Sequence, residues 1–219
     1  MKWIPYLMGI DPASPRCDAF YARLAQLGLP LVIHSGWEHS LLSAADQEWG
    51  NPLRLRRPLE AGVKVIAAHC ATQGEMRDDE LAGSPMVPAF SLLRRLIEEV
   101  RYRGLLYGDI SGVVSNWREP DMVRELVLEQ RWQGRLVNGS DYPLPGSPVL
   151  TSTTRMVENG LLSPEDAQQI GHIQGHDPLL YDFALKRLLR ADGQSFPARV
   201  FETAALFRPA VVAETRSRK

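Results

Sequence analysis

The sequence predicts an α/β protein built around a parallel sheet, and three observations lead to that fold class. Short apolar runs alternate along the chain with stretches whose apolar residues recur at helical spacing. The runs are apolar along their whole length, as expected of strands that are covered on both faces or that line a barrel. Polar residues directly follow several of the runs. Because parallel strands share one carboxyl edge, a functional site is expected there.

Five strands and the helices between them follow from this pattern. Phe20, Leu24 and Leu27 share one helical face, and Gly28 is typical of a helix end. The run VKVIAA and the run LLYGDI are typical of buried strands. A stretch rich in Gly, Asp and Pro, residues 71–88, is expected to be a loop. The predicted strands are residues 1–5, 29–33, 63–68, 105–110 and 136–137, and the helices between them are residues 18–27, 53–61, 89–102 and 121–132.

Strand patterns stop after residue 143, and helical patterns follow. The whole chain is interpreted as one domain, with its strands and their helices in residues 1–143. C-terminal helices are expected in residues 144–210, and a polar tail in residues 211–219. The expected C-terminal helices are residues 149–158, 164–171, 178–189 and 197–207.

Composition and charge exclude several classes of protein. The 219 residues are 44% apolar and 23% charged, with a formal net charge of −1, which argues against disorder and against a nucleic-acid binder. No apolar run approaches the roughly 20 residues of a membrane span, and the N-terminus lacks the apolar segment of a signal peptide. Cys17 and Cys70 are expected to be reduced thiols. We therefore expect a cytoplasmic protein with a small-molecule substrate and neither nucleic acid nor membrane as partner.

Three of the strands end in a residue that can bind a metal ion. His34, His69 and Asp141 each come just after an apolar run, so they are expected at the same edge of the sheet. Neutral imidazole nitrogens and a carboxylate oxygen are ligands that Zn²⁺ and its first-row neighbours accept. The sequence therefore predicts a divalent metal site, with zinc as the expected metal. Such a site leaves a position for a water whose pKa falls toward about 7.

Four motifs carry a resemblance to a known family. VIHSG at residues 32–36, VIAAHCA at 65–71, YGDIS at 107–111 and NGSDYP at 138–143 resemble the later strands of the amidohydrolase superfamily, and more closely its amidohydrolase 2 group. The resemblance implies a (β/α)8 TIM barrel that is incomplete, with strands 4 to 8 and C-terminal helices. It places His34 on the fifth strand, His69 on the sixth and Asp141 on the eighth. Asp109 falls on the seventh strand, where no metal ligand is expected. It would act near the substrate or anchor a hydrogen-bond network, and the structural role is favoured.

The sequence also departs from the pattern of that family. The family has an HxH pair on its first strand, and the five histidines of this chain include no such pair. If residues 1–5 are the fourth strand, the first three strands are missing, so an N-terminally truncated member is expected. Five βα units cannot close an eight-stranded barrel, and the exposed strand edge allows a homo-oligomer.

The resemblance implies a metal-dependent hydrolase that acts on an amide, ester, lactone or similar bond of a small molecule. His34 and His69 would hold the metal, and Asp141 would take the proton of the attacking water and deliver it to the leaving group. Two alternatives remain open. One is a decarboxylase or hydratase of small carboxylic acids, and the other is a truncated, catalytically inactive remnant that oligomerises or pairs with a partner.

Other polar residues have two interpretations each. Lys2 lies where some superfamily members carry a carboxylated lysine that bridges two metals, although a lysine lining the barrel is the simpler interpretation. Glu38 and His39 would contact the substrate, orient a ligand or face water. His172 and His176 have the spacing of a helical metal pair, but Gly175 favours a helix end and loop.

Overall fold

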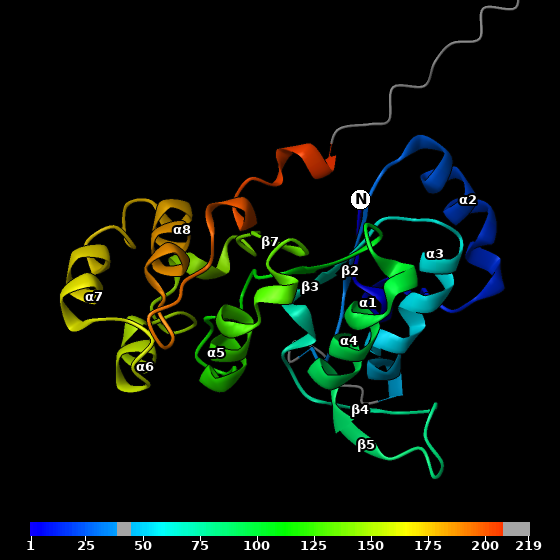
Figure 1. Ribbon diagram of the computed structural model, residues 1–219, viewed down its shortest axis with the longest axis horizontal. Helices are drawn as coiled ribbons and strands as arrows, with labels where there is room; N and C mark the ends of the chain where they lie inside the picture. Colours follow the sequence, from blue (N-terminus) through cyan, green and yellow to red (C-terminus); the bar gives the residue numbers. More distant parts are fainter. Residues whose placement is uncertain (39–44, 208–219) are drawn as a thin grey trace, which may run out of the picture.

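The computed structural model describes residues 1–38 and 45–207, and its centre is a five-stranded sheet (Figure 1). All four strand pairs are parallel, and the order across the sheet is β1-β2-β3-β6-β7. Spatial order therefore follows chain order, which is the winding of a TIM barrel rather than of a doubly wound sheet. The predicted fold class, an incomplete TIM-barrel type, is confirmed. The strands are β1 (Lys2–Trp3), β2 (Leu31–His34), β3 (Val65–Ala68), β6 (Leu106–Asp109) and β7 (Leu136–Val137).

The two faces of the sheet carry different side chains. Alternate strand residues belong to the hydrophobic core, namely Trp3, Leu31, Ile33, Val65, Ala67, Leu106 and Leu136. On the other face the register aligns Lys2 with Val32, Val32 with Ile66, and Ile66 with Tyr107. This second face corresponds to the inner wall of a barrel. It borders a cavity of about 170 Å³ that also reaches Asp141.

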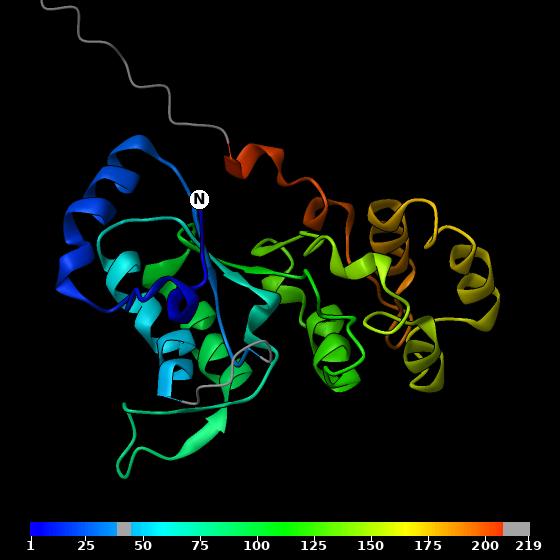
Figure 2. The ribbon, with the colours of Figure 1, turned by 180° about the vertical axis from the view of Figure 1, so that it is seen from behind.

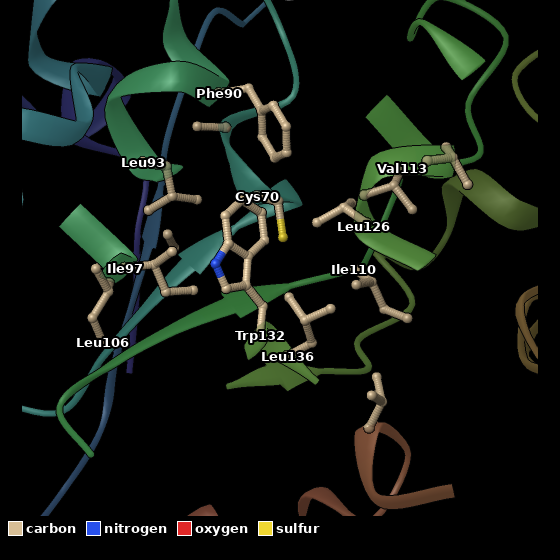
Figure 3. Packing of buried hydrophobic residues seen from close by; sticks show 14 of the residues in the cluster. Cys70, Phe90, Leu93, Ile97, Leu106, Ile110, Val113, Leu126, Trp132 and Leu136 are labelled. Atoms are coloured by element: carbon tan, nitrogen blue, oxygen red, sulfur yellow. The ribbon is translucent and has the colours of Figure 1, made fainter. Parts of the chain in front are cut away.

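Four helices follow strands and pack on the core face: α2 (Asp18–Leu27), α3 (Arg56–Glu60), α4 (Ala89–Glu98) and α5 (Pro120–Leu128). Figure 3 shows how α4 and α5 meet the sheet around the indole of Trp132, with Leu93 and Ile97 of α4 beside it and Leu136 of β7 below. The sulfur of Cys70 points into the same cluster. Both cysteines are free.

The structure corrects several predicted boundaries. The strand predicted over residues 1–5 ends at Trp3, and a four-residue helix, α1 (Pro5–Met8), follows it, because Pro5 starts the helix and left-handed Gly9 ends it. The helices predicted to reach residues 102 and 132 end as α-helices at Glu98 and Leu128, and a 3-10 turn follows each. The expected loop 71–88 contains an antiparallel hairpin, β4 (Glu75–Arg77) with β5 (Met86–Pro88).

The C-terminal helices lie at the end of the molecule opposite α2 (Figures 1 and 2). They are α6 (Thr153–Glu158), α7 (Pro164–Gly171) and α8 (Pro178–Leu188), and each begins after a residue whose side chain caps it. The helix predicted over 197–207 is wrong, because this stretch forms two short 3-10 segments, Ala198–Val200 and Thr203–Phe207. Within the described residues, none of the helices has the length and apolarity to cross a membrane.

Candidate active site

The structure brings the three predicted ligands together at the carboxyl edge of the sheet. His34 ends β2, His69 directly follows β3, and Asp141 lies four residues after β7. The rings of His34 and His69 meet edge to face, with 4.9 Å between their centroids. Asp141 Oδ2 lies 3.9 Å from His69 Nε2. Residues separated by more than one hundred positions in the sequence therefore share one small site, as the parallel strand pattern predicts.

His69 is fixed by hydrogen bonds to Ser111, which lies two residues after β6. Its Nδ1 lies 3.0 Å from the carbonyl oxygen of Ser111 and 2.9 Å from the Ser111 hydroxyl. A carbonyl oxygen accepts hydrogen bonds and cannot donate them, so Nδ1 carries the proton. The lone pair is then on Nε2, which faces Asp141. This is the tautomer that presents a nitrogen to a metal ion or to a proton.

Asp109 is the central hydrogen-bond acceptor of this network and is not one of the predicted metal ligands. It is buried, and it accepts hydrogen bonds from the backbone N–H and hydroxyl of Ser111 and from the backbone N–H of His69. Burial raises the pKa of Asp109 above its usual value, against the lowering effect of the Ser111 hydrogen bond. The network expected from the sequence is therefore present, and it orients His69.

His34 has a buried ring nitrogen without a hydrogen bond. His34 is 3% exposed, and its Nδ1 lies 3.6 Å from Glu38 Oε2. Its Nε2 has no hydrogen-bond partner among the described residues. Burial, together with the nearby His69, lowers the pKa of His34 to about 3. Burial and the charge of Arg118 lower the pKa of His69 to about 4. Both imidazoles are thus neutral near pH 7, which is the form that binds metals.

Four residues at or beside the site have backbone conformations that residues other than glycine rarely adopt. His69, Cys70 and Ala71 have φ values of 58°, 49° and 49°, and Asp141 has a φ of 57°. Left-handed conformations of residues other than glycine are costly, and they concentrate at functional sites. Gly112 leaves the space between these two side chains open, because a Cβ there would lie 3.3 Å from His69 Nδ1 and 3.4 Å from Asp141 Oδ2.

Arg118 belongs to the site but was not predicted from the sequence. It is 7% exposed, and with His34, Glu38, His69 and Asp141 it lines a cavity of about 50 Å³. One terminal N–H donates to the Thr72 hydroxyl at 2.7 Å, while Nε has no partner in the described part of the chain. Burial lowers the pKa of Arg118 to about 10, so the guanidinium remains charged at pH 7. Its loop position after β6 was the one available signal, since no motif or spacing marks it.

Among the remaining candidate residues, Lys2 and Glu38 lie beside the predicted ligands, whereas His172 and His176 are exposed. Lys2 lies on the inner face of β1, and its Nζ is 3.5 Å from Asp141 Oδ1. Glu38 lies beside His34, whereas His39 falls outside the described residues. His172 and His176 are exposed at the end of α7 and in the turn after it, as the loop interpretation predicted.

The donor chemistry of this site fits a divalent ion of the zinc type. It offers two neutral imidazoles, a buried unpaired nitrogen on His34 and the carboxylate of Asp141. Across residues 1–38 and 45–207, however, no three His, Cys, Asp or Glu side chains are close enough to form a complete metal-binding group. The metal site therefore stays a prediction.

Comparisons with known proteins yield structural similarity alone. No protein-family model and no curated protein matches the chain. An uncharacterized TIM-barrel protein from Bordetella bronchiseptica is 16% identical, with a TM-score of 0.43, and the match covers 80% of this chain and 53% of that one. A protein from Pseudomonas putida, named as a candidate 2-pyrone-4,6-dicarboxylic acid hydrolase, is 19% identical, with a TM-score of 0.44 and coverage of 94% and 61%.

The chain thus spans between about half and three fifths of the length of these two solved chains. Similarity at these TM-scores carries no argument about the site or its chemistry. The fold assignment rests on the strand order and parallel pairing described above.

Proposed function

We propose that this chain carries the ligand and proton-transfer residues of a metal-dependent hydrolase that cleaves an ester, lactone, amide or similar bond of a small molecule. The observation that supports it is the convergence of His34, His69 and Asp141 at the carboxyl edge of the sheet, with the Nε2 of His34 buried and unpaired. A buried polar atom without a partner is costly unless a ligand satisfies it.

Each residue has a distinct role in this proposal. A divalent ion of the zinc type, held by His34, His69 and Asp141, would supply positive charge that lowers the pKa of water toward about 7. Asp141 accepts a proton from the attacking water and later donates it to the leaving group. The Ser111 carbonyl accepts a hydrogen bond from His69 Nδ1–H, and the lone pair of His69 is therefore on Nε2, which faces Asp141.

Arg118 supplies the binding site for the substrate. A buried guanidinium with a free Nε–H is suited to a carboxylate, since its N–H groups pair with both oxygens of that group. Trp117, partly exposed at 37%, lines the same cavity and offers an aromatic surface beside the cation. A small substrate that carries a carboxylate next to the scissile bond fits this wall best.

A panel of carboxylate-bearing esters, lactones and amides, assayed with added Zn²⁺ or Mn²⁺, tests the proposal. We expect turnover by the wild-type chain and a loss of about 10²–10⁴-fold in kcat for D141N, the range of general acid–base catalysis. R118M should raise KM more than it lowers kcat. D121N, which changes an exposed aspartate of α5, is the matched control and should retain activity.

Full turnover by D141N would contradict the proposed role of this residue, and no turnover with any member of the panel would contradict the hydrolase. Release of CO₂ from small aromatic carboxylic acids in the same assay would instead support the decarboxylase alternative.

A further inference from the structure

A lysine of the C-terminal helix α8 reaches the loop that carries Asp141. Lys186 is fully buried, with an exposure of 0%. Its Nζ lies 2.7 Å from the carbonyl oxygen of Gly139, 2.7 Å from Asp182 Oδ2 and 3.4 Å from Asn138 Oδ1. The three N–H groups of the ammonium therefore each have an acceptor. Two of the three acceptors belong to the segment Asn138-Gly139-Ser140-Asp141.

This segment is also held from two other sides. The backbone N–H of Asn138 donates to the carbonyl of Val200 at 2.8 Å. Gly139 packs so closely on Asp109 that a Cβ there would lie 2.7 Å from the carboxylate. Asp141 itself has a left-handed backbone conformation, which persists where the surroundings impose it. Contacts from α8, from the segment after it and from β6 thus impose the path of residues 138–141.

The charge of Lys186 also offsets several carboxylates. Its ammonium lowers the pKa of Asp109, although burial of that residue has the larger, opposite effect. Burial raises the pKa of Asp182, the charge and hydrogen bond of Lys186 lower it, and the charges of Asp109 and Asp141 raise it by smaller amounts. Removing Lys186 alone would leave Asp182 buried without its ion-pair partner, which is strongly destabilising in general.

We propose that Lys186 is the positioning residue of Asp141: from α8 it holds the backbone carbonyl of Gly139 and the side-chain oxygen of Asn138, and so sets the place of the carboxylate beside His69. This inference rests on the proposed function of Asp141. It gives the C-terminal helices a direct part in the site, and Asp182 a supporting part as the fixed partner of the ammonium.

The alternative is that the Lys186–Asp182 pair only stabilises its own helix. The chain offers a matched control for that case. Arg95 of α4 pairs with the buried carboxylate of Asp78, whose side chain is 3% exposed like that of Asp182. Neither residue of the control pair contacts residues 138–141.

The experiment compares K186M/D182N with R95M/D78N, so that in neither variant is one member of the buried ion pair left without the other. Backbone hydrogen exchange measured by mass spectrometry reports on residues 138–141 with no metal present. We expect exchange there to accelerate at least about tenfold in K186M/D182N and to stay at the wild-type rate in R95M/D78N. Cobalt(II) titration, read from its visible spectrum, should show binding about tenfold weaker for the first variant, and unchanged for the second.

Equal exchange at residues 138–141 in the two variants would overturn the role of Lys186. Failure of the wild-type chain to take up cobalt would contradict the proposed function instead, and the exchange measurement would still decide whether Lys186 holds the loop. Loss of protection across the whole chain in K186M/D182N, with none in the control, would also overturn the inference, because it would show a general structural role.

Discussion

Replacement of Ser111 with alanine tests how the strand-end network holds His69. The Ser111 hydroxyl contacts His69 Nδ1 at 2.9 Å and donates to the buried carboxylate of Asp109. Ser115 is the matched control, because it is 2% exposed, lies in the same loop and donates to the carbonyl of Gly112. A hydrogen bond to a charged group contributes about 1.5–3 kcal/mol and a neutral one about 0.5–1.5 kcal/mol. S111A should therefore lower the free energy of unfolding by about 1 kcal/mol more than S115A.

The same pair of variants has a second expected difference. Removing a hydrogen-bond partner of a ligating histidine weakens metal binding by about 10–100-fold, and the Ser111 carbonyl still holds Nδ1 in S111A. We therefore expect the lower end, about tenfold, for S111A and wild-type affinity for S115A. Urea unfolding followed by tryptophan fluorescence and competitive Zn²⁺ titration measure the two quantities. Identical stability and identical affinity in S111A and S115A would refute this account of His69.

Two further predictions concern stability. The N–H groups of Arg95 hold the pKa of Asp78 below its usual value. The Asp78–Arg95 pair therefore stabilises the folded chain fully above the unfolded-state pKa of about 3.9, and this contribution is lost as the pH falls through the lower pKa of the folded state. D78N should therefore lose less stability than wild type between about pH 5 and pH 2.5 in urea titrations, whereas D121N should follow wild type. A loss of stability in D78N equal to that of the wild type over this pH range would contradict the pairing. L96A, in a fully buried position of α4, should cost about 2–5 kcal/mol in urea unfolding, and L179A, half exposed on α8, far less; similar losses would mean that α4 is not packed as described.

The strand ends could be predicted because their signal is local. An apolar run followed by His34, His69 or Asp141 fixes both the residue and its edge of the sheet, since parallel strands end together. The alternating faces of the strands could not be predicted in the same way. Val32 and Ile66 are as apolar as their neighbours in the core, so the sequence does not distinguish the inner face of the sheet from the face under the helices.

Arg118 and Lys186 show what the sequence pattern lacks. Arg118 lies in a loop where charged residues are usually solvated, and its burial comes from contacts with segments distant in the sequence, such as Thr72. Lys186, with Asp182 four residues before it, has the spacing of an exposed helical ion pair. Its burial against Gly139 depends on how α8 packs on the loop after β7, which no local pattern determines.

The short 3-10 segments of residues 198–207 have a related cause. Their apolar residues have helical spacing, but Phe201 packs on Phe183 of α8 and Val200 accepts a hydrogen bond from Asn138. Tertiary contacts therefore shape this stretch in place of a regular helix.

The central claim is that His34, His69 and Asp141 act together as a site for a divalent ion. Its most direct test is the metal content of the purified chain by inductively coupled plasma mass spectrometry, after loading with Zn²⁺ and dialysis against metal-free buffer, with H34A and H172A measured in parallel. The account predicts about one equivalent of zinc in the wild type and in H172A, and its loss in H34A. A folded wild-type chain without zinc, or equal zinc in H34A, would contradict it.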